Sequence, residues 1–307
     1  MRYFQPLLPF VLGWALILSS ESLSALGLIN GLAQLLLFGL VVCLPTWRTG
    51  RMSYVDIGWP WGLVLLALLA LVFSESSQMR LMVFSALLAG VGLRMGLGAL
   101  NLWRSGKFRK EFPRYQYQRL RWAEEGKSNV PLALQVDALS QGLANASFLA
   151  LPILIIGTNP EPGLMPLEIM GLMISFLALG LESVADYQKV QFLRGQKRQA
   201  QHNQVCDVGL WRWCRHPNYF FEWMVWNGMV ISAVPSWLML GNRESLTVWL
   251  LLGAGLLLAS GFMYRTLVFI TGAIPSEYYS ARKRPDYVNY QAVTNRFFPG
   301  IPKSTTK

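Results

Sequence analysis

Eight apolar runs dominate the chain, and each has about the 20 residues that a helix needs to cross the hydrocarbon core of a membrane. They cover residues 4–20, 27–45, 55–74, 80–103, 132–157, 164–187, 219–240 and 246–269. Hydrophobic residues make up 53% of the 307 residues and charged residues only 14%, which excludes an ordinary soluble domain. We therefore expect an all-α, polytopic integral membrane bundle with seven or eight transmembrane helices.

Basic residues lie almost entirely in alternate connections between these runs. Arg2, the loops at 46–53, 104–128 and 188–217, and the tail after residue 264 hold 24 of the 27 Lys and Arg residues. Connections rich in Lys and Arg stay in the cytoplasm, so we expect both termini there. The net charge of +11 then reflects topology and contact with membrane lipids. No soluble domain remains to present a basic face to nucleic acid.

The runs suggest an N-terminal transmembrane hairpin at 1–50, a main membrane domain at 51–300 and a short tail at 301–307. We expect no metal site, because no zinc-ligand spacing connects the cysteines and histidines, which are Cys43, Cys206, Cys214, His202 and His216.

The stretch 209–222 joins a cationic segment, residues 212–216, to an apolar aromatic helix that begins at Pro217. Asn218 and Glu222 follow at i and i+4, so they share one helix face. A helix N-terminus preceded by Arg and His favours an anionic ligand. The alternative is anchoring at the membrane interface, with cations at the headgroups, an aromatic belt, and Glu222 paired with a lysine.

The third and fourth apolar runs each contain an informative ionisable residue. Asp56 enters the 55–74 run and is either a helix N-cap near the interface or an intramembrane functional group. Arg94 lies among glycines in the 80–103 run. It either pairs with an acid such as Asp56 or holds a phosphate or carboxylate of a ligand.

Polar residues at i, i+4 spacing mark two further helix faces. Gln141 and Asn145 extend a polar stripe from Asp137, which faces a cavity or another helix and either binds substrate or forms a network without a ligand. Glu182 and Asp186 close the sixth run. They repel each other and oppose the helix dipole, so we expect a cationic or hydroxyl-rich partner beside them.

Three residue sets together resemble the membrane steroid 5-alpha-reductase superfamily, and most closely its largely uncharacterised bacterial branch. They are Gly-Leu-Trp-x-x-x-Arg-His-Pro-Asn-Tyr-x-x-Glu at 209–222, Glu-x-x-x-Asp at 182–186, and Pro-Asp-Tyr-x-x-Tyr…Phe-Phe-Pro at 285–299. Shorter matches at 55–59, 92–94 and 114–115 extend the similarity over residues 53–300. The first set is the most specific.

The resemblance implies NADPH in a cytoplasm-facing pocket of the bundle, a lipid-like enone substrate and, from the branch it resembles, a bacterial inner membrane. Asn218 and Glu222 match contacts at the nicotinamide end. We assign cofactor binding to the matching and cationic positions, which are Arg94, Asp186, Arg194, Arg215, His216, Asn218, Tyr219, Glu222, Arg265 and Tyr290. We assign substrate binding to Gln141 and Asn145.

The steroid enzymes hold the substrate carbonyl between a carboxylate from an early span and a tyrosine from a later one. Asp56 matches the carboxylate. Where the tyrosine is expected, just before Arg94, this chain has Ala89-Gly90-Val91. The acid that stabilises the enolate oxygen would then come from Tyr54 or Tyr115, so the catalytic candidates are these two tyrosines and Asp56.

Three functions fit these patterns. The first is NADPH-dependent reduction of a C=C bond in a lipid. The second is methyl transfer from S-adenosylmethionine, because the distantly related isoprenylcysteine and phospholipid methyltransferases share the Arg-His-Pro-x-Tyr segment. Asn218, Glu222 and the many arginines favour the reductase, since S-adenosylmethionine carries no phosphate. The third is a lipid-binding bundle without catalysis.

Overall fold

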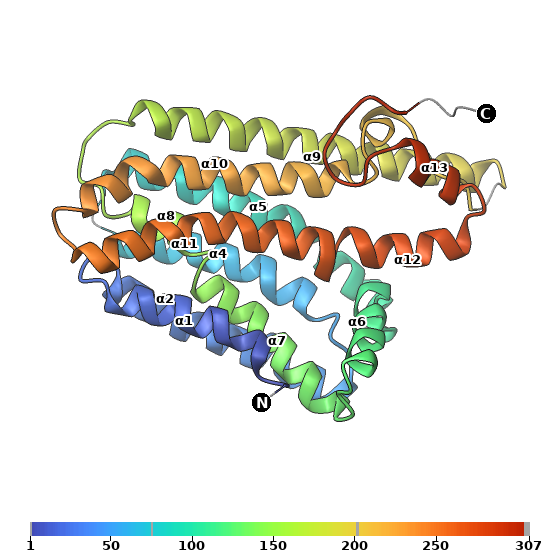
Figure 1. Ribbon diagram of the computed structural model, residues 1–307, viewed down its shortest axis with the longest axis horizontal. Coiled ribbons are helices and arrows are strands. Elements are labelled where there is room, and N and C mark those ends of the chain that lie inside the picture. Colours follow the sequence, from blue (N-terminus) through green and yellow to red (C-terminus); the bar gives the residue numbers. More distant parts are fainter. Residues whose placement is uncertain (1, 75, 201–202, 304–307) are drawn as a thin grey trace. The chain divides into compact units, whose positions relative to one another are not determined.

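The computed structural model of the chain describes residues 2–74, 76–200 and 203–303, and every regular element among them is a helix (Figure 1). Seven helical segments are long and apolar enough to cross a membrane, namely Ser24–Thr49, Val55–Phe73, Gln78–Arg104, Val130–Ile156, Pro166–Arg198, Pro217–Leu240 and Leu246–Lys283. The expected all-α membrane bundle is confirmed. The first apolar run forms a shorter helical segment, Gln5–Ser19, so seven of the eight expected spans reach full length.

The chain divides into two compact units. Unit 1 contains the residues up to Leu172 together with Gly228–Ser260, and unit 2 contains Met173–Asn227 together with the residues from Gly261 onward. Three helices contribute residues to both units. They are α9 (Pro166–Arg198), α10 (Pro217–Leu240) and α11 (Leu246–Arg265). The expected division at residue 50 stays a prediction, and residues 304–307 of the expected tail lie outside the described residues.

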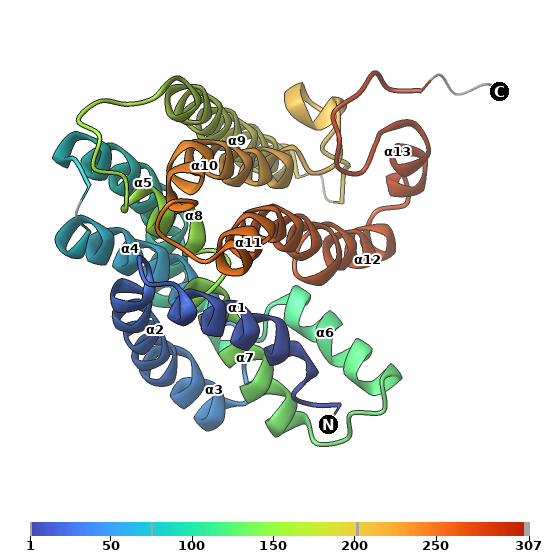
Figure 2. The same ribbon diagram turned by 60° about the vertical axis from the view of Figure 1, so that its left-hand side comes forward.

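Unit 1 is built mainly from the helices of the first half of the chain. They are η1 (Gln5–Leu7), α1 (Leu8–Ser19), α2 (Ser24–Phe38), η2 (Gly39–Cys43), α3 (Leu44–Thr49), α4 (Val55–Phe73), α5 (Gln78–Arg104), η3 (Lys107–Arg109), α6 (Pro113–Glu124), α7 (Val130–Ala146) and α8 (Leu151–Ile156). Figure 2 shows α1, α2 and α7 side by side, and these helices contact one another. Between α4 and α5, a Cβ at Gly92 would lie 2.5 Å from the carbonyl oxygen of Pro60. The glycine therefore permits the two backbones to pack closely.

A fully buried ion pair connects two spans of unit 1. Arg80 Nε on α5 donates to Glu168 Oε1 on α9 at 2.8 Å, and both side chains are 0% exposed. The arginine also donates to the carbonyl oxygens of Asn159 (3.1 Å), Glu161 (2.6 Å) and Gly163. Because each charge is paired and each donor is used, this pair avoids the cost of an isolated charge in an apolar interior.

Unit 2 contains η4 (Gly209–Arg212), η5 (Thr266–Ile270), α12 (Ala273–Lys283) and α13 (Tyr287–Val293), with parts of α9, α10 and α11. The sixth apolar run was expected to end at 187, but α9 continues to Arg198. Its added residues are mostly Gln, Lys and Arg, which are good helix formers. The fifth run is interrupted after Ala146, because Ser147 leaves helical geometry (φ −118°, ψ −112°) and Pro152 begins a new short helix.

We predict that Arg80→Gln destabilises the protein by about 3–5 kcal/mol, because Glu168 would remain buried without its charged partner. Arg243→Gln is the matched control, since Arg243 is exposed. Thermal or denaturant unfolding in detergent measures both variants. Equal stability of the two variants would contradict the structural importance of the pair.

Candidate functional site

The start of the 209–222 motif is fixed to α9 by two hydrogen bonds. Trp211 Nε1 donates to the carbonyl oxygen of Ala185 at 2.8 Å, and the backbone N–H of Leu210 donates to Gln188 Oε1 at 2.9 Å. Gly209 has φ +54°, and a Cβ there would lie 2.5 Å from the Gln188 side chain. Only glycine meets both conditions, which explains the residue that opens the motif.

The centre of the motif is held by the buried carboxylate of Glu277 on α12. Arg215 binds both of its oxygens, at 2.7 and 3.2 Å, and His216 Nε2 lies 3.2 Å from Oε1. Arg296 Nε and Gln291 Nε2 donate to Oε2 at 3.2 and 3.0 Å. Residues of three segments that are distant in sequence therefore meet at one acid.

Arg215 also binds the backbone of the C-terminal segment. Its guanidinium group donates to the carbonyl oxygens of Gln291 (3.0 Å) and Thr294, and its backbone N–H donates to Asn295 O at 2.8 Å. Arg215 was expected to bind a cofactor phosphate. In the structure its donors are directed to Glu277 and to the chain after α13.

His216 is buried beside this arginine and stacks on Tyr219, with ring centroids 5.4 Å apart. Burial lowers the pKa of His216 below its ordinary value of 6.5, although the hydrogen bond to Glu277 opposes this shift. The imidazole is therefore neutral at neutral pH.

Asn218, in the first turn of α10, donates from Nδ2 to Asp186 Oδ1 on α9 at 3.1 Å. Its own amide oxygen is buried and has no hydrogen-bond partner among the described residues. One helical turn from each member of this pair lies a further buried carboxylate, Glu222 on α10 and Glu182 on α9. The expected grouping of Asn218, Glu222 and the 182–186 helix end is thus consistent with the geometry of unit 2.

A cavity of about 240 Å³ adjoins the motif within unit 2. It combines three cationic side chains with hydroxyl groups and aromatic rings. Its lining consists of Lys189, Cys206, Trp211, Arg215, His216, Asn218, Tyr219, Ser276, Ser280, Arg284, Tyr287 and Tyr290. Burial raises the pKa of Tyr287 and of Tyr290, so both hydroxyls stay protonated at neutral pH. This donor set suits an anionic or hydroxylated ligand.

Five of the expected cofactor residues line the cavity, and a sixth, Asp186, accepts a hydrogen bond from Asn218. The remaining four, which include Glu222, are not part of the lining. Arg194 on α9 and Arg265 at the end of α11 are exposed. Arg94 lies half-buried on α5 in unit 1. The six that gather are Asp186, Arg215, His216, Asn218, Tyr219 and Tyr290.

Unit 1 pairs two of the catalytic candidates. The Tyr115 hydroxyl on α6 donates to Asp56 Oδ1 at 2.5 Å, and Arg114 binds the other carboxylate oxygen at 2.9 Å. Burial, together with the neighbouring Asp56 carboxylate, raises the pKa of Tyr115 well above 10.0. Tyr54 instead packs its ring against Phe108, with centroids 5.7 Å apart. Tyr115 is therefore the tyrosine that the structure joins to the carboxylate.

The expected substrate residues lie on α7. Asn145 is fully buried, and its Nδ2 donates to the carbonyl oxygen of Trp59 at 3.0 Å, while its backbone oxygen accepts from Asn30 Nδ2 at 3.1 Å. Gln141, one turn earlier, is half-buried. Asn145 thus connects three spans, while its Oδ1 is buried without a hydrogen-bond partner among the described residues. Its role in substrate binding stays a prediction.

Glu277 was not among the expected site residues. Seven residues that line the cavity were not expected there either, namely Lys189, Cys206, Trp211, Ser276, Ser280, Arg284 and Tyr287. Glu277 is one of two acids after residue 265, in a tail that is otherwise basic. An acid directly before two tyrosines, in a tail rich in cations, was the available signal. Among the described residues no group of three or more His, Cys, Asp or Glu side chains could hold a metal, and His202 lies outside those residues.

Because His216 is held neutral, we predict that stability falls when the medium is acidified. The unfolded chain binds the proton at its ordinary pKa of 6.5, before the folded chain does. The unfolding temperature should therefore drop from about pH 7 to about pH 5. His216→Gln keeps a hydrogen-bond donor and should show a smaller drop. An identical pH profile in both proteins would contradict the assignment.

No curated protein and no solved structure matches the chain. The model of one family, described as a protein of unknown function (DUF1295), matches residues 43–294. This range includes the Asp56–Tyr115 pair, the 209–222 motif and α13. Because the match covers most of the 307 residues, the chain belongs to the DUF1295 family.

Proposed function

We propose that the protein is an NADPH-dependent membrane reductase that reduces the C=C bond of a lipid-like enone. The observation that carries this proposal is the hydrogen bond between Tyr115 and Asp56. It provides a carboxylate and a phenol together, the combination that the steroid 5-alpha-reductase superfamily uses, although the chain lacks a tyrosine just before Arg94.

The residues of unit 2 fit a pyridine dinucleotide phosphate. The buried oxygen of Asn218 offers an acceptor for a carboxamide N–H, and a buried acceptor without a partner is costly unless a ligand or water satisfies it. Lys189 and Arg284 line the neighbouring cavity with serine hydroxyls, a donor set that suits a phosphate or ribose. The cavity of about 240 Å³ has room for part of such a ligand.

When bound, NADPH supplies the hydride that adds to the β-carbon of the enone. Tyr115, kept protonated by its raised pKa, turns its O–H from Asp56 to the substrate carbonyl oxygen and stabilises the negative charge that develops there. Arg114 remains on the Asp56 carboxylate and holds it in place. Protonation of the α-carbon by water completes the reduction. The assignment of Tyr115 is argued from contacts within unit 1 and that of NADPH binding from contacts within unit 2, and each has its own experiment.

Methyl transfer is the second candidate, because the Arg-His-Pro-x-Tyr segment is common to both enzyme classes. The cavity argues against it. S-adenosylmethionine is a sulfonium cation without phosphate, whereas Lys189 and Arg284 make this cavity basic. A lipid-binding bundle without catalysis remains the third candidate, and it predicts no turnover.

Cofactor affinity tests the unit 2 assignment. The purified protein in detergent should bind NADPH at micromolar concentration or below and should not bind S-adenosylmethionine. Asn218→Leu should weaken NADPH binding about ten-fold or more, because it removes the buried acceptor. Asn289→Leu, at an exposed site on α13, is the control. Preference for S-adenosylmethionine, or binding of neither, would overturn the assignment.

Turnover tests the unit 1 assignment. Tyr115→Phe should lower NADPH oxidation with an enone lipid about 10²–10³-fold and leave NADPH affinity unchanged. Tyr117→Phe on the same helix and Tyr54→Phe should retain activity. The assay follows NADPH absorbance with a 3-oxo-4-ene steroid and with a straight-chain enone lipid. Full activity of Tyr115→Phe would exclude this tyrosine as the acid.

A further inference from the structure

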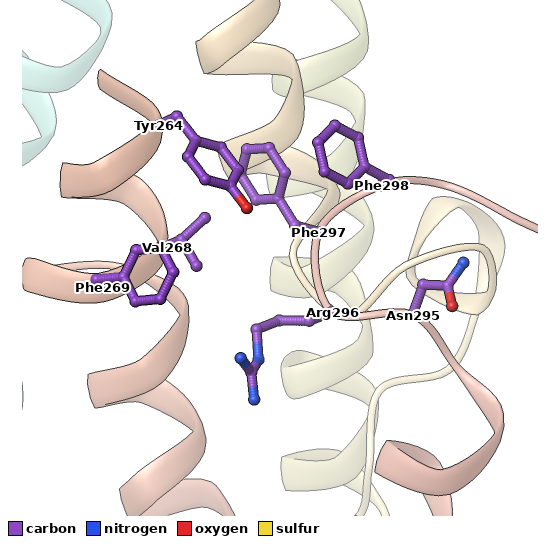
Figure 3. A pocket seen from close by; sticks show the side chains of 7 residues that line it. All are labelled: Tyr264, Val268, Phe269, Asn295, Arg296, Phe297 and Phe298. Atoms are coloured by element: carbon purple, nitrogen blue, oxygen red, sulfur yellow. The ribbon is translucent and has the colours of Figure 1, made fainter. Parts of the chain in front are cut away.

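Unit 2 has a second cavity, of about 380 Å³, which the proposed reaction does not use. Figure 3 shows its lining, in which the rings of Tyr264, Phe297 and Phe298 lie together and the guanidinium group of Arg296 lies apart from them. Val268, Phe269 and Asn295 complete the lining. The cavity therefore has an apolar part and a cationic part.

The apolar part is a cluster of aromatic rings. The Tyr264 and Phe297 rings meet edge to face with centroids 5.1 Å apart, and Trp223 lies 5.9 Å from Phe298. Phe298 is 51% exposed and Phe269 is 45% exposed. Large aromatic side chains that remain exposed around a cavity mark a surface that binds an apolar partner.

The cationic part is Arg296. Its Nε donates to Glu277 at 3.2 Å, yet 44% of its side chain is exposed. Glu277 is also bound through both oxygens by Arg215, so two guanidinium groups share one carboxylate. With His216 neutral, the local charge is positive, which suits an anionic group.

The helices that line the cavity indicate what kind of molecule it binds. Val268 and Phe269 belong to η5, a π-helical turn that directly follows α11, and such turns are frequent at functional sites. Along α11 itself, Leu250, Leu257 and Leu258 are 52%, 72% and 47% exposed. On a helix that is long and apolar enough to span the membrane, these residues form a lipid-facing surface. Tyr264, in the last turn of the same helix, lines the cavity.

We propose that this cavity binds one anionic phospholipid, with the acyl chain against the aromatic rings and the phosphate at Arg296. The charge of Arg296 and the contribution of Tyr264, in the last turn of the membrane-spanning helix α11, favour a lipid over a protein partner. This assignment does not rest on the proposed reductase activity, because none of the cavity residues is assigned to the reaction.

Native mass spectrometry of the full chain in detergent tests this proposal. The protein is titrated with phosphatidylglycerol and with phosphatidylcholine of identical acyl chains. The wild type should bind one molecule of the anionic lipid about five-fold more tightly than the zwitterionic one, the factor expected for one basic residue. Arg296→Gln should remove this preference, and Phe298→Ala, at an exposed position, should weaken binding of both lipids.

Arg282→Gln is the matched control, because Arg282 is an exposed cation on α12 that lies over the Tyr278 ring. It should leave the preference unchanged. Equal binding of the two lipids by the wild type, or equal effects of Arg282→Gln and Arg296→Gln, would overturn the proposal. Displacement of the lipid by millimolar inorganic phosphate would identify a free-phosphate site and would also overturn it.

Discussion

The contacts of unit 2 centre on the buried carboxylate of Glu277, which binds residues of the 209–222 motif and of the C-terminal segment. It is 5% exposed, and such a charge is unfavourable in a protein interior unless cations and donors surround it. Arg215, His216 and Arg296 supply them. Arg215 and His216 belong to the 209–222 motif, and Arg296 belongs to the C-terminal segment. The Glu277 carboxylate therefore has all of its partners only when the motif and the C-terminal segment are both folded. Each of the two cavities has part of this network in its lining.

In unit 1, too, carboxylates are paired with cations or hydrogen-bond donors. The Arg80–Glu168 pair is fully buried and connects α5 to α9. The Asp56 carboxylate is bound by the Tyr115 phenol and by the Arg114 guanidinium group. Glu111 precedes α6, and its carboxylate accepts hydrogen bonds from the backbone N–H groups of Met52 (2.8 Å) and Ser53 (3.1 Å), which precede α4. The segment that leads into α6 is thereby attached to the start of α4.

Hydrophobic run length predicted the helices well, because a membrane span needs a continuous apolar segment, and the run at 246–269 matches α11 and η5 closely. The site was predicted less completely. Asn218 and Asp186 were identified from their positions on helix faces, which local spacing reveals. The partner of Arg215 was missed, because Glu277 lies 62 residues away and no local pattern specifies a contact across that separation. Likewise, sequence alone did not show which of Tyr54 and Tyr115 contacts Asp56, because that contact depends on where α6 lies in unit 1.

We propose that the 209–222 motif and the C-terminal helices of unit 2 form a binding site for a phosphorylated dinucleotide. Hydrogen–deuterium exchange with and without NADPH tests it most directly, because exchange reports protection segment by segment. We expect NADPH to slow exchange in residues 206–219 and 276–290, and S-adenosylmethionine to leave both segments unchanged. Unchanged exchange with NADPH, or protection by S-adenosylmethionine alone, would contradict it.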